Sequence, residues 1–217
     1  MWHIFPENHD ELNRLSEDTV VVSAEPVPEL GLPHVTVNRG GGAETAVQHL
    51  LSLGHRRIAA IKGFGGQADR DFCDGYHRGL TGEGVPFDPK LVLELERGRS
   101  NLEEGERTIE RWFHRLATVT APVTTDDEVA IGVIRALQRR GQRVPEDIAV
   151  IGFDDLPVAA YVEPPLTTLA QPAEEQGSRL AKLFLKRMKA PHQITDYQVA
   201  LPTRLVVRES CGARRQR

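Results

Sequence analysis

The sequence has little cysteine and no long apolar segment. Cys73 and Cys211 are the only cysteines among 217 residues, and no Cys-x-x-Cys spacing occurs. This argues against a disulfide framework or a zinc site, and fits a reducing compartment. No apolar run approaches the ~20 residues of a membrane span, and the first residues lack the basic and apolar regions of a secretory signal. We therefore expect a cytoplasmic protein that makes no contact with a membrane.

An excess of positive charge is also missing. The chain carries 27 basic and 31 acidic side chains, for a net charge of -4. It therefore has no overall positive field that would hold nucleic acid. The proportions of hydrophobic residues, 40%, and charged residues, 27%, are those of globular proteins. This length and composition predict one or two packed domains that do not bind DNA by charge alone.

Short apolar runs alternate with amphipathic helical patterns, which predicts an α/β fold with mainly parallel strands. Strands are expected at residues 2–5, 19–23, 35–38, 58–62, 91–95, 122–124, 148–151, 167–169 and 199–201, the last continuing into 204–207. Helices are expected at 43–53, after a capping box at 100–103, after Asp126 or Asp127, and at 172–189.

Two glycine clusters suggest phosphate binding at first sight. Residues 63–68, Gly-Phe-Gly-Gly-Gln-Ala, match the dinucleotide pattern G-x-G-x-x-G/A after a predicted strand. Asp69, Asp71 and Asp74 would line the same turn and repel a pyrophosphate, so a nucleotide-dependent enzyme using NAD or NADP is only a minor alternative. Residues 40–42, Gly-Gly-Gly, lack a following Gly-Lys-Ser/Thr and are interpreted as a tight turn.

No catalytic or metal-binding pattern is found in the sequence. The eight histidines show no ligand spacing, and no Gly-x-Ser-x-Gly nucleophile motif is present. We therefore predict no enzymatic activity, no cofactor and no metal.

Acidic pairs follow two of the predicted strands. Asp126 and Asp127 follow the strand at 122–124, and Asp154 and Asp155 follow the one at 148–151. Arg70 lies in the turn after another strand, and the carboxyl ends of parallel strands border the ligand crevice of such folds. One arginine and two acids at this edge predict a small polar ligand, while helix capping remains an alternative for each pair.

Several ordered motifs resemble the lactose-repressor and galactose-repressor (LacI/GalR) family of bacterial transcription regulators. The motifs lie at Gly54–Gly63, Thr125–Gly132, Val144–Asp155, Pro164–Thr168, Gln171–Pro172, Leu201–Thr203 and Arg208–Ser210. The resemblance runs from about residue 19 to residue 210. It implies a periplasmic-binding-protein-like core of two α/β lobes joined by crossover strands, with a small effector between them and a homodimer along one side.

The resemblance also implies particular ligand-binding residues. Arg70 matches the arginine that clamps the effector, Asp154 matches the acid that accepts ligand hydroxyls, and Asp126 falls at a cleft position. Gln171 resembles a residue of a crossover between the lobes.

Two positions depart from the family pattern. Asn38 follows Val37 where the family usually has Asp-Asn, and Ser100 replaces an aromatic residue that often stacks on the effector. Both put a typical sugar or purine effector in doubt.

The resemblance predicts the domain organisation as well. Residues 1–36 and 169–201 are expected to form a remnant of the N-terminal lobe, 37–168 and 202–210 the C-terminal lobe, and 211–217 a tail. We expect DNA binding to require a helix-turn-helix headpiece, and we expect this sequence to lack one. The strand at 19–23 and the helix at 172–189 are expected to expose apolar surface. A sugar-binding receptor of the same architecture is an alternative function.

Overall fold

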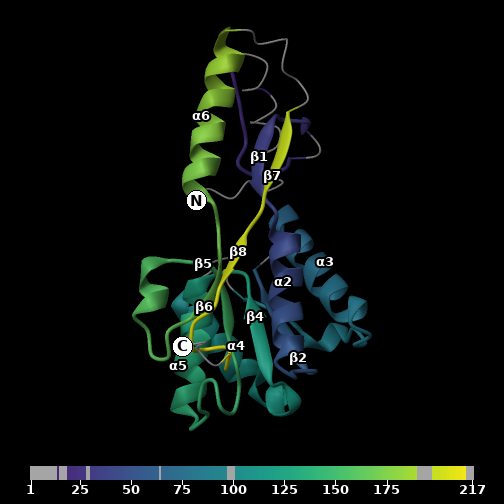
Figure 1. Ribbon diagram of the computed structural model, residues 1–217, viewed down its shortest axis with the longest axis vertical. Helices are drawn as coiled ribbons and strands as arrows, with labels where there is room; N and C mark the ends of the chain where they lie inside the picture. The colour runs from purple at the N-terminus through teal and green to yellow at the C-terminus, as the bar shows by residue number, and fades with distance from the viewer. Residues whose placement is uncertain are drawn as a thin grey trace. The chain divides into compact units, whose positions relative to one another are not determined.

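The computed structural model describes residue 14 and residues 19–27, 30–63, 65–96, 101–189 and 197–213 (Figure 1). The chain divides into two compact units. The small unit consists of Met1–Asn38, Gly66–Ala68 and Pro172–Pro202, and the large unit of Arg39–Gly65, Asp69–Gln171 and Thr203–Arg217. The assignment of the small unit as the remnant of an N-terminal lobe stays a prediction. In the part of the chain that is described, no helix is long and apolar enough to cross a membrane.

The large unit is built on a six-stranded sheet, which confirms the predicted α/β class. Its strand order is β3-β2-β4-β5-β6-β8, and only β8 is antiparallel to its neighbour. The strands are β2 (Ile58–Lys62), β3 (Val92–Glu94), β4 (Ala121–Thr124), β5 (Ile151–Asp154), β6 (Thr167–Ala170) and β8 (Arg204–Val206). The helices are α2 (Arg39–Ser52), α3 (Gln67–Gly82), α4 (Leu102–Trp112) and α5 (Asp127–Arg139), with 3₁₀ turns η3 (Pro89–Leu91), η4 (Phe113–Thr118) and η5 (Pro157–Ala160).

Helices cover both faces of this sheet. Ile58 and Ala60 of β2 pack with side chains of α2 and α3, whereas Ala59 and Ile61 pack with those of α4 and α5. Successive side chains of a strand point to opposite faces, so a strand covered on both faces must be apolar throughout. This accounts for the continuous apolar run of β2 and for its correct prediction.

The small unit pairs β1 (His34–Val37) in parallel with β7 (Gln198–Leu201), and α6 (Ala173–Lys189) packs against this pair. Leu183 of α6 is buried with Val35 and Leu201. The opposite side of α6 exposes Phe184, Leu185 and Met188, whose exposed fractions are 38%, 57% and 58%. The expectation of exposed apolar surface on this helix is therefore confirmed.

Two strand predictions were wrong. Only Ser23 of the predicted strand 19–23 pairs, in a single parallel bridge with His34, because the Val21 carbonyl accepts from the Arg187 side chain instead of from a strand. The strand predicted at 148–151 begins at Ile151. The Ala149 N–H donates to the Thr120 carbonyl and the Val150 N–H to the Ser210 carbonyl, and both acceptors lie outside the strands of the sheet. The expected strand at 2–5 lies outside the described residues.

Two helix starts also differ from prediction, and one helix, α3, was not predicted. The capping residue of α4 is Asn101, whose side chain accepts from the Glu104 N–H at 3.0 Å, so the capping box was placed one residue early. Gly40–Gly42 are not a turn between elements but the first turn of α2, where a Cβ on Gly40 or Gly42 would lie within 3 Å of neighbouring atoms. The sequence predicted a turn at Arg70, whereas this residue lies inside helix α3.

Candidate functional site

Polar side chains gather where the parallel strands of the large unit end. Asp154 is the last residue of β5, Gln171 follows β6, and Asp126 lies two residues after β4. The Gln171 side-chain amide donates a hydrogen bond to Oδ1 of Asp154. The structure therefore joins two of the predicted ligand-binding residues directly, at the edge where open parallel sheets bind ligands.

Asp154 has an unusual environment for a carboxyl group. Burial raises its pKa to about 7, against the opposing effects of the Gln171 hydrogen bond and the nearby Arg39 guanidinium. Its backbone φ of 123° and that of Asp155, 60°, lie in the left-handed region that side-chain-bearing residues rarely adopt. A strained, partly buried acid of this kind is typical of a binding site.

Arg39 is a residue of this site that sequence reasoning missed. It is the first residue of α2, and its guanidinium carbon lies 5.1 Å from the centroid of the Phe153 ring. Its charge acts on the neighbouring Asp154 carboxyl, whose pKa it lowers. No local motif marks Arg39, and only its position next to the predicted Asn38 could have drawn attention to it.

The paired acids Asp126 and Asp127 have separate roles. Asp126 caps α5, because its Oδ1 accepts from the Val129 N–H at 2.9 Å, so the capping alternative is confirmed for it. The buried Asp127 accepts from the Leu156 N–H at 2.7 Å and from the Thr168 hydroxyl at 2.5 Å. Burial raises the pKa of Asp127 to about 6. These bonds tie α5 to the segments after β5 and within β6.

Arg70 is exposed in the first turn of α3. The helix crosses α2 closely: a Cβ on Gly75 would lie 2.0 Å from the carbonyl oxygen of Gly40. This contact fixes the middle of α3 against the start of α2, and a Cβ on Gly40 would lie 2.9 Å from the carbonyl oxygen of Asp71, the neighbour of Arg70. It gives a physical reason for the glycine at position 75, five residues after Arg70.

The glycine-rich turn before α3 does not fit a phosphate. The buried Asp69 accepts from the Gly65 N–H at 2.8 Å, and a Cβ on Gly63 would lie 2.9 Å from an oxygen of Asp69. A carboxylate therefore fills the place that a pyrophosphate would need, since anions of like charge repel each other. In the described residues, no group of three or more His, Cys, Asp or Glu side chains could hold a metal.

The remaining predicted residues are less completely placed. Asn38 follows β1 directly and is the last residue of the first segment of the small unit. Its backbone N–H donates to the Leu201 carbonyl at 2.7 Å. Ser100 lies outside the described residues.

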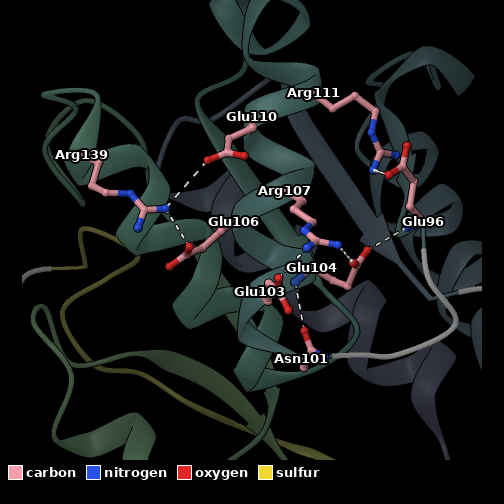
Figure 2. A network of polar contacts seen from close by, with 9 residues as sticks. All are labelled: Glu96, Asn101, Glu103, Glu104, Glu106, Arg107, Glu110, Arg111 and Arg139. Carbon is pink, nitrogen blue, oxygen red and sulfur yellow. Dashed lines mark hydrogen bonds and ion pairs between the residues drawn. The ribbon is translucent and has the colours of Figure 1, made fainter.

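A polar network joins the two ends of the connection in which Ser100 occurs (Figure 2). The Glu96 N–H donates to the buried carboxylate of Glu104 at 3.1 Å, and the Glu96 carboxylate pairs with Arg111 at 2.8 Å. Asn101 completes it by capping α4. These contacts hold the end of β3 against α4.

This sheet, with ligand-type side chains at its carboxyl edge, defines an α/β binding unit of the periplasmic-binding-protein type. The family described as "Periplasmic binding protein-like domain" matches residues 47–211, and the chain belongs to this family. Its relatives are regulators of the LacI type, which confirms the resemblance seen in the sequence.

Two curated relatives and two solved structures illustrate the similarity. The transcriptional regulator CelR of Thermobifida fusca is 35% identical over 185 residues, covering 85% of this chain and 53% of that protein. The repressor CytR of Escherichia coli K12 is 33% identical over 177 residues, covering 80% and 50%. A CelR–cellobiose complex is 33% identical with a TM-score of 0.78, covering 87% and 57%. A LacI family regulator from Enterococcus faecium with bound ribose is 28% identical with a TM-score of 0.81, covering 93% and 75%. The chain thus spans about half the length of these curated relatives.

Proposed function

We propose that the chain is the effector-binding part of a LacI-type transcription regulator. Its ligand would be a small, hydroxyl-rich molecule such as a sugar, bound at the carboxyl edge of the large sheet. The observation that carries this proposal is the Asp154–Gln171 pair beside Arg39 at that edge. Relatives solved with cellobiose and with ribose support the ligand class.

The chemistry of these groups suits hydroxyl ligands. A hydroxyl donates one hydrogen bond and accepts others, so it pairs well with a carboxylate beside amide and guanidinium donors. Asp154 and Gln171 offer acceptors, and Arg39 and Arg70 offer donors in a planar fork. Ligand binding would shift the population of a DNA-binding state, without covalent chemistry, in a cytoplasmic protein.

Calorimetric titration with cellobiose, ribose and nucleosides tests the site. Asp154→Asn and Arg70→Ala should each weaken the binding of whichever compound the wild type binds by about tenfold or more, because each loses a charged hydrogen bond. Arg143→Ala is the matched control, since its ion pair with Asp147 is exposed and contains none of the site residues. Equal affinity in the wild type and both site variants would show that the ligand binds elsewhere.

We also propose that the complete regulator is a homodimer that binds DNA through a headpiece. Two large, at least partly apolar side chains in or next to η5 are exposed: Val158 to 46% and Tyr161 to 88%. Exposed apolar surface of this kind supports dimerisation. Tyr161→Glu should shift a dimer towards monomer in sedimentation experiments. This chain alone should give no specific gel shift with operator DNA. Tight binding would contradict the proposal that a separate headpiece binds the DNA.

A further inference from the structure

The turn after β5 adopts a conformation that its own residues disfavour. Asp154 and Asp155 have φ values of 123° and 60°. Such left-handed conformations cost residues other than glycine on the order of 1–3 kcal/mol each, and they persist only where surrounding contacts hold them. The contacts around this turn therefore show what keeps Asp154 in place.

One set of contacts comes from Arg208, which lies just after β8. Its Nη2 pairs with Oδ1 of Asp155 at 2.6 Å, and its Nη1 donates to the Leu166 carbonyl at 2.8 Å. Its backbone N–H donates to the Thr167 hydroxyl at 2.8 Å. The side chains of Arg208 and Asp155 are only 19% and 25% exposed, so water screens this ion pair less than a surface pair.

A second set of contacts holds the backbone of the turn. The Asp155 N–H donates to the Thr168 hydroxyl at 3.3 Å, and that hydroxyl donates to Asp127. The next N–H, that of Leu156, donates to the other oxygen of Asp127. The backbone is thus fixed from β6 and α5, while the Asp155 side chain is fixed by Arg208.

We propose that Arg208 and Asp155 are positioning residues, whose ion pair keeps the turn left-handed and so presents Asp154 to Gln171 and to a ligand. Neither residue needs to touch the ligand. The part concerning ligand rests on the proposed function, whereas the part concerning the turn does not. In this way Arg208, two residues after the end of β8, supports the site without belonging to it.

The consequence of losing the pair follows from the backbone preference. Without Arg208, the turn relaxes towards negative φ, and the carboxyl of Asp154 leaves Gln171 for solvent. Its pKa then falls from about 7 towards its usual range, because burial is what raises it. Glycine adopts positive φ without strain, so Asp155→Gly should remove the strain at position 155 and make the turn less dependent on Arg208.

The test is NMR of the ligand-free chain, comparing the wild type with Arg208→Met and with the double variant Arg208→Met/Asp155→Gly. The readouts are the carboxyl ¹³C titration of Asp154 and the φ-dependent coupling at its amide. Arg208→Met should lower the Asp154 pKa and change the coupling, and the double variant should return both towards the wild-type values. Arg143→Met, which breaks the exposed pair with Asp147, is the control and should change neither.

Unchanged titration and coupling in Arg208→Met would overturn the proposal, as would a failure of Asp155→Gly to restore them. If Arg208→Met does not fold, Arg208→Gln takes its place with the same expected results. Calorimetry with cellobiose forms the ligand arm: Arg208→Met should weaken binding about tenfold and the double variant should recover it. A wild type that binds no sugar contradicts the proposed function, while the ligand-free readouts still decide the role of Arg208.

Discussion

Replacing Gly75 with alanine perturbs the crossing of α2 and α3 that places Arg70. The added Cβ would lie 2.0 Å from the Gly40 carbonyl oxygen, 2.6 Å from its carbon and 2.7 Å from its Cα. An ordinary contact begins near 3.4 Å, so the two helices must separate by about 1.4 Å. A backbone carbonyl cannot turn away as a flexible side chain can, and we expect the start of α3 to move with Arg70.

The expected loss of stability follows from two opposing effects. Overpacking a well-packed contact typically costs about 1–3 kcal/mol, and a backbone partner favours the upper part of this range. Alanine in a helix recovers about 1 kcal/mol relative to glycine. Gly75→Ala should therefore lower the free energy of unfolding by about 1–2 kcal/mol.

Urea unfolding followed by circular dichroism measures this difference. Gly82→Ala is the matched control, because it lies in the same helix and its Cβ would meet no atom within 4 Å. The control should be as stable as the wild type or more stable by up to about 1 kcal/mol. The close crossing would be refuted if Gly75→Ala were no less stable than Gly82→Ala.

Three further predictions concern single groups. Tyr76→Phe should cost about 1–2 kcal/mol in urea unfolding, since the buried hydroxyl donates to the Ile58 carbonyl at 2.8 Å, and no loss would mean that this bond contributes nothing. Asp126→Ala should cost about 1 kcal/mol by removing the cap on the Val129 N–H, and Asp126→Ser should recover most of it. The pKa of Asp127 is raised from 3.8 to about 6, so the folded state holds its proton more tightly and the free energy of unfolding should fall as pH rises through this interval. The difference between wild type and Asp127→Asn should show that slope, and a pH-independent difference would contradict the raised pKa.

The sequence predicted best those elements whose burial follows a simple period. The run at 58–62 is apolar because helices cover both faces of β2, and α2 and α5 show clear apolar stripes. Helix α3 was missed because two of its packing positions are the glycines 75 and 79, which lower helix propensity. Only the approach of α2 explains these glycines, and a single sequence does not reveal which helix will lie there.

The sequence likewise predicted some residues of the candidate site and missed others. Asp154 and Gln171 were predicted because strand ends and family motifs mark them, and the structure joins them. Arg39 was missed because its proximity to Asp154 arises from the packing of α2 beside β5, segments more than a hundred residues apart. Arg208 was noticed only as part of a motif, and its contact with Asp155 depends on the antiparallel return of β8.

The proposed function depends most of all on the binding of a small hydroxyl-rich ligand at the carboxyl edge of the large sheet. Isotope-labelled chain titrated with cellobiose and with ribose, and followed by NMR, tests it most directly. We expect saturable binding of at least one compound, with the largest shift changes at Arg39, Arg70, Asp154 and Gln171. Saturable binding whose shift changes lie away from these four residues, or no binding of either sugar at millimolar concentration, would contradict this proposal.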